Sequence, residues 1–282
     1  MKSSELQAAT GVAISDGGEV GERLEIASKY YLAPYLRKLA HWLNNSKERT
    51  NFTYDLTENN RSQMESMASF ICDTPFETIK GYVQELLDDG DLQAHHASMA
   101  SQIPNMDTRL RPGRRIFWYA LIRALKPRCV IETGVDKGMG SIIICAALIR
   151  NRAEGYEGDY FGTDINVKAG RLLSGPYAEC GRILYGDSIA SLEKFDQKID
   201  LFINDSDHSA DYEAREYQTI EGKLSPNAVL LGDNSHVTDR LSAFAHGSGR
   251  AFLFAAEAPK DHWYPGAGVG VAFPKTGAGK FQ

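Results

Sequence analysis

The sequence predicts an α/β protein with a seven-stranded, mostly parallel sheet whose last strand is reversed, preceded by a helical region. Two observations support this prediction. From residue 129 onward, short apolar segments alternate with helical segments, which is typical of a sheet covered by helices on both faces. In addition, a loop with three glycines separates the first apolar segment from the helix that follows it.

The first strand, loop and helix of the sheet carry the clearest pattern in the chain. A short apolar run at 129–131 ends at Glu132, glycines follow at 134, 138 and 140, and an apolar helical segment covers 142–149. Glycine lets the backbone turn sharply and lets a ligand approach closely. The free N–H groups at the helix start then face that ligand. We therefore interpret the stretch as the first unit of a Rossmann-like nucleotide-binding domain.

Six further apolar segments are expected to form the remaining strands. They cover residues 160–164, 181–186, 199–203, 228–231, 251–255 and 268–273. A helical segment follows each of the first five strands, as parallel neighbours require. No helical segment separates the last two strands, which indicates that the final strand runs in the opposite direction.

The chain before the sheet divides into a flexible tail at 1–21 and a helical accessory region at 22–106, followed by the main domain at 107–282. The tail is polar and Gly-rich and lacks the apolar core of a signal peptide. In the accessory region, Pro34 is expected to break the first helix, Thr57 to cap a second and Pro75 to precede a third. This region serves either as a lid over the substrate or as an oligomerisation surface.

Composition excludes several classes of function. The formal net charge of the 282 residues is −6, and no Lys/Arg-rich run with interleaved aromatic residues occurs, which disfavours a nucleic-acid partner. No apolar run approaches the ~18 residues of a membrane span. The four cysteines show no close pairing, and Cys129 and Cys145 lie in apolar runs as small core residues. We expect a reduced, cytoplasmic protein without a membrane partner.

The spacing of the glycines indicates which nucleotide binds. The dinucleotide fingerprint Gly-x-Gly-x-x-Gly is absent. The pattern Glu132-x-Gly134-x-x-x-Gly138 instead resembles motif I of class I S-adenosylmethionine-dependent methyltransferases, in the form of the catechol and caffeoyl-CoA O-methyltransferase families. The resemblance implies that Glu132, Gly134, Gly138 and Ser141 hold the methionine part of S-adenosylmethionine.

Two further strand ends are candidates for the rest of this cofactor. Ligands of open α/β sheets bind beyond the carboxyl ends of the strands. Asp164, followed by Ile165, ends the second strand, and an acid there can accept both ribose hydroxyls. The resemblance implies adenine recognition at Asp187 and Ser188, after the third strand. The alternative for each polar residue is an ordinary turn residue or helix cap.

The ends of the fourth and fifth strands suggest a metal site at Asp205, Asp233 and Asn234. Oxygen ligands around open positions are what Mg²⁺ prefers. Adjacent carboxylates repel one another, which favours a cation between them. The two aspartates are separated by 28 residues, as in catechol O-methyltransferases, where an Asp-Asn pair also ends the fifth strand. Solvated loop ends are the alternative.

His208 is the expected general base. The resembled families have a catalytic lysine three residues after the first metal aspartate, and this chain has His208 there. In this respect it resembles the Asp-x-x-His arrangement of macrolide-sugar O-methyltransferases. A histidine can take a hydroxyl proton near pH 7. Asp207 either orients His208 or is a surface acid, and His236 is a supporting residue or an alternate base.

Three aromatic residues between the last two strands complete the set of candidates. His262, Trp263 and Tyr264 form either a wall of the acceptor pocket or ordinary packing on the sheet end.

Together these features predict a Mg²⁺-dependent O-methyltransferase that moves the methyl group of S-adenosylmethionine to a hydroxyl of a small natural product. N-methylation fits the same residues. The alternatives are an NAD(P)-dependent oxidoreductase, which the glycine spacing opposes, and a catalytically silent cofactor-binding subunit. We expect a homo-oligomer, a dimer or higher.

Overall fold

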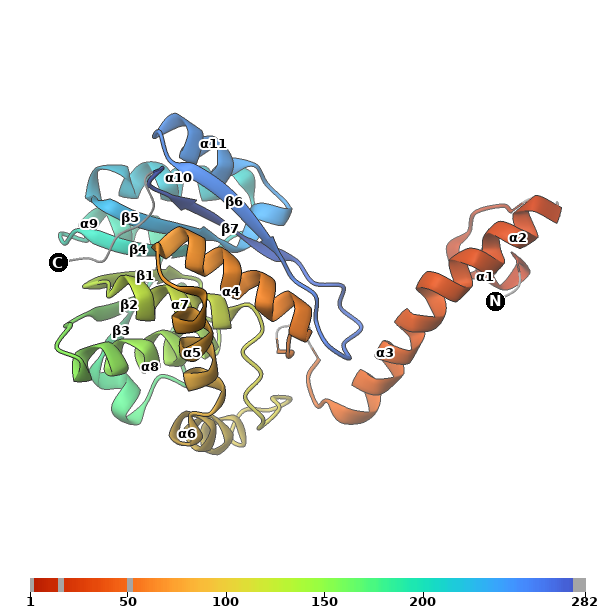
Figure 1. Ribbon diagram of the computed structural model, residues 1–282, viewed down its shortest axis with the longest axis horizontal. Coiled ribbons are helices and arrows are strands. Elements are labelled where there is room, and N and C mark those ends of the chain that lie inside the picture. The colour runs from red at the N-terminus through yellow and green to blue at the C-terminus, as the bar shows by residue number, and fades with distance from the viewer. Residues whose placement is uncertain (1–2, 15–17, 50–52, 276–282) are drawn as a thin grey trace.

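The chain folds around one seven-stranded sheet in the order β3-β2-β1-β4-β5-β7-β6. In the computed structural model, which describes residues 3–14, 18–49 and 53–275, β7 runs antiparallel to both of its neighbours and the remaining pairs are parallel (Figure 1). The predicted mostly parallel sheet with a reversed last strand is therefore confirmed.

The strands lie where the sequence places them, with one longer than expected. They are β1 Cys129–Thr133, β2 Asp159–Asp164, β3 Gly181–Tyr185, β4 Ile199–Asn204, β5 Leu224–Gly232, β6 Ala251–Ala256 and β7 Gly268–Phe273. The sequence predicted only 228–231 for β5, because its first half contains Pro226 and Asn227, which are rare in strands. A register irregularity between Ile199 and Leu201 accommodates that polar half beside β4.

The helices of the body cover both faces of the sheet. They are α4 Glu58–Cys72, α5 Phe76–Leu87, α6 Gly90–Ala100, α7 Arg115–Leu125, α8 Met139–Ala153, α9 Ser188–Lys194, α10 Ala210–Ile220 and α11 Arg240–Gly247, with short helices η2 Gly175–Glu179, η3 Glu221–Lys223 and η4 Asp233–His236. Thr57 caps α4 as predicted, with its side chain accepting the Asn60 N–H. Helix α6, capped by Asp89, was not predicted as a separate element.

Alternate residues of each strand divide the core into two layers. Val130 and Leu201 point to the face covered by α4, α5, α7 and α8, whereas Ile131 and Phe202 point to the face covered by α9, α10 and α11. Both faces are apolar because every βα connection lays a helix on the sheet. The four cysteines are free and buried, which confirms Cys129 and Cys145 as core residues.

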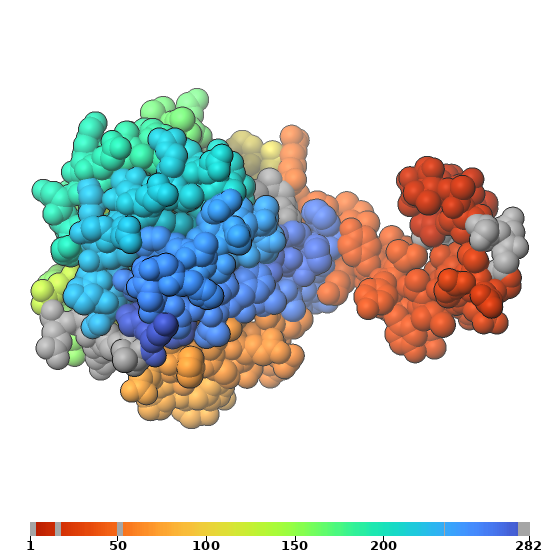
Figure 2. Space-filling view, turned by 90° about the horizontal axis from the view of Figure 1, so that it is seen from above, coloured from red at the N-terminus to blue at the C-terminus, as the bar shows by residue number. Residues whose placement is uncertain are grey.

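The N-terminal helices form an arm that projects from the body (Figures 1 and 2). The arm contains α1 Ser3–Thr10, α2 Gly18–Ala27, the π-helix η1 Ser28–Leu32 and α3 Ala33–Asn45. Pro34, the expected break, lies in the first turn of α3, and the wider π-turn precedes it instead of an interruption. A helix also lies within the predicted flexible tail, although 1–2 and 15–17 lie outside the described residues.

Neither oligomerisation nor location is tested by the fold. No helix among the described residues is both long enough and apolar enough to cross a membrane. The homo-oligomer and the cytoplasmic location stay predictions.

A short extended segment before α4 ties three distant parts of the chain together. Tyr54 forms a parallel bridge with Pro112, and Leu56 an antiparallel bridge with Pro259. The Asn60 side chain adds two bonds to the chain after β6, donating to the Ala256 carbonyl and accepting from the Ala258 N–H. We call these contacts of residues 54–60 with Pro112 and with residues 256–259 the clamp. The clamp brings Tyr54, the start of α7 and the end of β6 to one edge of the sheet.

Candidate functional site

Two cavities meet at Gly134, beyond the carboxyl ends of β1, β2 and β4. The larger has a volume of about 380 Å³, and the smaller about 40 Å³. Gly134 lines both cavities, and its φ of +84° lies in the left-handed region. A Cβ here would lie 1.9 Å from the carbonyl oxygen of Asp205, so only glycine fits between the two loops.

Glu132 lines the smaller cavity. It is 2% exposed and accepts hydrogen bonds from the hydroxyls of Tyr160 and Ser141. Burial raises the pKa of Glu132 to about 7, although these hydroxyls and Arg115 lower it. The Ser141 hydroxyl is therefore used inside the protein, beneath the predicted cofactor loop. Gly138 caps α8 with a φ of +94°.

Asp164 and Ile165, which are predicted to bind the cofactor, line the larger cavity. One oxygen of Asp164 accepts the Asp136 N–H at 2.9 Å and the other accepts the Asn166 N–H at 2.7 Å. Each carboxylate oxygen can accept a second bond, so the acid both fixes the loop and keeps capacity for a ligand. Ile165 is 81% exposed and offers an apolar surface in a polar surrounding.

Asp187 and Ser188 also line this cavity, but both have structural roles. Asp187 caps α9 by accepting the Ala190 N–H, and it accepts a bond from the Tyr212 hydroxyl at 2.7 Å. These hydrogen bonds lower the pKa of Asp187. Ser188 is buried and bonds to Glu216 and Tyr212. Asp187 is therefore a helix cap, and adenine recognition by Asp187 and Ser188 stays a prediction.

Glu216 of α10 is a buried acid that sequence reasoning missed. Its carboxylate accepts hydrogen bonds from four side chains around the cleft: Thr133, Ser188, Asn204 and Ser206. Burial raises its pKa to about 7. Glu216 therefore joins the ends of β1 and β4 to the start of α9. Its position on the inner face of the amphipathic helix α10 was the sequence signal that could have revealed it.

The structure brings the two predicted metal aspartates together, with an arginine between them. Arg114 Nη2 pairs with Asp233 Oδ1 and lies 4.0 Å from Asp205 Oδ2. Burial and the neighbouring charge of Asp233 raise the pKa of Asp205, whereas Arg114 lowers it. Arg114 precedes α7, directly after the tight Pro112-Gly113 turn.

The other end of the guanidinium is held by the clamp segment. Arg114 Nη1 donates to the Tyr54 hydroxyl at 3.3 Å and lies 3.6 Å from Glu257 Oε2. The Tyr54 hydroxyl in turn donates to Glu257 Oε1 at 2.7 Å. Gly113, at a φ of +54°, packs against Tyr54, and a Cβ there would lie 3.0 Å from its ring. The turn at Gly113, the Tyr54 side chain and the Arg114 side chain therefore pack together.

The metal site predicted at Asp205, Asp233 and Asn234 stays a prediction. Among the described residues, no group of three or more His, Cys, Asp or Glu side chains is arranged to hold a metal ion. The side chain of Asn234 lies outside the described side chains. Arg114 already places one positive charge beside both aspartates, which disfavours a Mg²⁺ ion bound by the two.

The two candidate bases lie on the same edge in different settings. His208 is exposed on the loop after β4. Hydrogen bonds from the side chain and the N–H of Ser209, together with the His208 charge, lower the pKa of Asp207. His236 is exposed, and its Nδ1 lies 3.0 Å from the Asp233 carbonyl oxygen. Because a carbonyl only accepts, Nδ1 carries the proton and Nε2 is the acceptor in the neutral ring.

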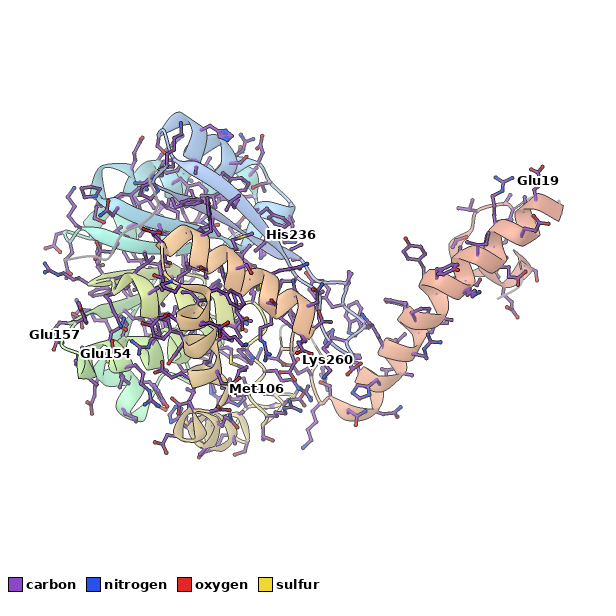
Figure 3. All side chains as sticks on the ribbon, in the orientation of Figure 1. Glu19, Met106, Glu154, Glu157, His236 and Lys260 are labelled. Carbon is purple, nitrogen blue, oxygen red and sulfur yellow. The ribbon has the colours of Figure 1, made fainter. Side chains whose placement is uncertain are left out.

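The predicted aromatic residues pack against the arm and the clamp. The His262 ring lies 5.5 Å from that of Tyr54 and 5.9 Å from that of Trp42 in α3. Burial, Arg111 and Lys38 lower the pKa of His262 to about 4. Trp42, Tyr54 and His262 line a cavity of about 260 Å³, together with Arg109 and Lys260. Figure 3 shows His236 and Lys260 on the side of the body that faces the arm. His262 therefore packs against these rings and lines this cavity, and its role as a wall of the acceptor pocket stays a prediction.

Besides Glu216, three residues of the site escaped prediction: Tyr54, Arg114 and Glu257. Each lies in a segment that sequence patterns assign to a loop or an element end. Their meeting depends on the clamp, which joins positions about 60 and 200 residues apart. The Pro-Gly turn before Arg114 was the available signal for a fixed side chain there.

The central part of the domain matches a known family. Residues 131–235 match the family model described as a methyltransferase domain. This match confirms the predicted class of enzyme, a methyltransferase. No curated protein matches the chain.

Several solved structures are similar to this chain at low sequence identity. A protein from Klebsiella pneumoniae described as a candidate O-methyltransferase is 14% identical, with a TM-score of 0.50 over 70% of this chain and 96% of that one. An O-methyltransferase from Bacillus cereus in complex with SAH is 15% identical, with a TM-score of 0.44 over 69% and 91%. A methyltransferase from Geobacter sulfurreducens is 20% identical, with a TM-score of 0.45 over 70% and 97%. The first of these confirms the predicted fold.

Proposed function

We propose that the protein transfers the methyl group of S-adenosylmethionine to a hydroxyl oxygen of a small organic acceptor. The observation that carries this proposal is the pair of cavities that meet at Gly134, inside the matched methyltransferase domain. Each cavity contains an acid that ends a strand, Glu132 in one and Asp164 in the other.

The cavities suit the two ends of this cofactor. The nucleoside would lie in the larger cavity, with Asp164 accepting ribose hydroxyls and Ile165 against the base. The amino-acid end would lie in the smaller cavity, where Glu132 faces an ammonium group and Lys137 a carboxylate. S-adenosylmethionine supplies a methyl group already activated on a sulfonium. The protein's task is therefore to position the acceptor, exclude water and remove one proton.

A histidine at this edge removes the acceptor's proton. We propose His208, because it follows Asp205 by three residues and its exposed ring is open to an acceptor. His236 is the second candidate, because the Asp233 carbonyl holds its ring with Nε2 as the acceptor. The proposed reaction needs no metal ion, because Arg114 already places a positive charge beside Asp205 and Asp233.

The acceptor is proposed to be a hydroxylated natural product, such as a phenol or a sugar. The cavity beside Trp42, Tyr54 and His262 supports this class, because aromatic walls with charged rims suit small polar organic molecules. It lies next to the smaller cavity along the chain, since Thr53 lines one and Tyr54 the other.

Calorimetric titration with S-adenosylhomocysteine tests the cofactor assignment. We expect one site per chain, weakened by about tenfold or more in Asp164→Ala, which loses the ribose acceptor. Asp159→Ala, at the exposed opposite end of β2, is the matched control and should bind normally. Absence of binding to the wild-type protein, or binding of NAD⁺ in its place, would contradict the proposal.

Turnover of a hydroxylated acceptor by paired variants tests the base. His208→Gln is expected to lower kcat by about 10²-fold or more while cofactor affinity stays within about twofold. His236→Gln should have the smaller effect on kcat. The reverse order would move the role to His236, and two unaffected variants would remove both histidines from the mechanism.

A further inference from the structure

The densest group of buried charges in the site consists of one arginine and three carboxylates. The Arg114 guanidinium contacts or closely approaches Asp205, Asp233 and Glu257. Arg114, Asp233 and Glu257 are each less than a tenth exposed, and the Asp205 side chain is 16% exposed. Buried charges of one sign are costly unless an opposite charge lies among them.

We propose that the Arg114 guanidinium takes the place of a divalent cation at this edge of the sheet. On this inference Asp205 and Asp233 hold an arginine rather than a metal, and the site keeps its geometry without a bound ion. Arg114 is a positioning residue, because it acts through the two loops that follow β4 and β5. The inference does not depend on the identity of the acceptor.

The position of Arg114 explains why an ion would not displace it. A Mg²⁺ ion bound by both aspartates would lie at about 2.0–2.1 Å from their oxygens. Arg114 Nη2 already pairs with Asp233 and lies 4.0 Å from Asp205, so ion and guanidinium would stand as close like charges. The divalent ion and the guanidinium would repel each other strongly at such close range.

The guanidinium is also fixed from its other side. Tyr54 and Glu257 hold Nη1, and the turn at Gly113 fixes the backbone from which the side chain starts. If the Arg114 side chain rotated out of the site, three buried carboxylates would be left without a neighbouring cation. Arg114 is therefore held in the site by contacts at both ends of its guanidinium group.

The role of Asp205 links this cluster to the cofactor cleft. Its N–H donates to the Thr133 carbonyl at 2.9 Å, and its own carbonyl packs against Gly134. Asp205 also lines the smaller cavity. A fixed positive charge at Arg114 thus holds in place the wall against which the methyl donor would bind.

Mn²⁺ binding followed by electron paramagnetic resonance tests the proposal without any need for turnover. Wild-type protein should bind no Mn²⁺ at this site, with the same spectrum for Asp205→Asn. Arg114→Ala should gain one site, at least about tenfold tighter than any wild-type binding. The double variant Arg114→Ala with Asp205→Asn is the matched control and should lose the gained site.

Two results would overturn the proposal. One is stoichiometric Mn²⁺ binding by the wild-type protein that Asp205→Asn abolishes. The other is a folded Arg114→Ala protein, as judged by circular dichroism, that gains no Mn²⁺ site. If Arg114→Ala does not fold, the comparison of wild type with Asp205→Asn decides alone. A failed S-adenosylhomocysteine titration would leave these readings unchanged, so the two proposals fail separately.

Discussion

At the level of single residues, the cleft depends on Gly134, a position that admits no side chain. Its N–H donates to the Thr163 carbonyl of β2, while the Asp205 carbonyl of the β4 loop packs against its Cα. Three neighbouring strand ends therefore meet at one glycine. A side chain there would push apart the loops that line both cavities.

Gly134→Ala is expected to destabilise the protein by about 3 kcal/mol or more and to weaken S-adenosylhomocysteine binding at least about tenfold. The physical reason is the overlap of the new Cβ with Asp205, added to a φ of +84°. Urea unfolding and calorimetry measure the two effects.

Gly155→Ala is the matched control for this prediction. Its φ is +88°, but nothing lies within 4 Å of an added Cβ. It should cost only about 1 kcal/mol of backbone strain and leave binding unchanged. Equal effects of the two substitutions would show that strain, and not the close approach of Asp205, is what matters at Gly134.

At the level of elements, the clamp between the segment before α4 and the end of β6 builds the charged part of the site. Asn60 is 4% exposed and makes two hydrogen bonds with the chain at Ala256 and Ala258. Next to this contact, Glu257 reaches Tyr54 and Arg114. The position of Arg114 therefore depends on an asparagine in a different helix.

Asn60→Ala is expected to lower the free energy of unfolding by about 2–4 kcal/mol, because it leaves two backbone groups unpaired. Amide hydrogen exchange should speed up at Ala258 in particular. Asn59→Ala, an exposed neighbour in the same helical turn, should change neither quantity. Slow exchange at Ala258 in Asn60→Ala would disprove the clamp.

Elements with a local signal could be predicted, and contacts between distant loops could not. The strands at Ile199 and Gly268 and the cap at Thr57 follow from apolar runs and capping chemistry. Asp205 and Asp233 meet as predicted because parallel strands end at one edge. Arg114 was missed because nothing in its neighbouring residues shows which carboxylates the fold brings to it.

At the scale of the whole molecule, buried acids and paired acids set opposite limits on the pH range of stability. Burial raises the pKa of Glu132 and of Glu216 to about 7. In contrast, hydrogen bonds from Arg123 and Lys126 lower the pKa of Glu154 to about 2, despite some opposing burial. Glu154 therefore stabilises the fold above its ordinary pKa, and this contribution is lost as the pH falls toward 2.

Glu132 and Glu216, whose pKa values are raised, have the opposite effect on stability. The folded protein holds their protons more tightly than the unfolded chain, so their contribution is complete below about pH 4.5 and disappears as the pH rises through 7. Each is worth roughly 3 kcal/mol by the size of its pKa shift. Maximum stability of the cofactor-free protein is thus expected near pH 5, below neutrality.

Urea unfolding of Glu216→Gln between pH 5 and pH 8.5 tests this expectation. The wild-type free energy of unfolding should fall across this range, and the variant should show a smaller fall, because one of the acids with a raised pKa is gone. The amide can replace the carboxyl here, since Asn204 Oδ1 has no hydrogen-bond partner among the described residues and, after rotation of the Asn204 amide, could accept from the side-chain amide introduced at position 216. Glu221→Gln, an exposed acid just after the same helix, is the control and should keep the wild-type slope. A wild-type stability that rises from pH 5 to pH 8.5 would show that neither buried acid holds its proton in the folded protein.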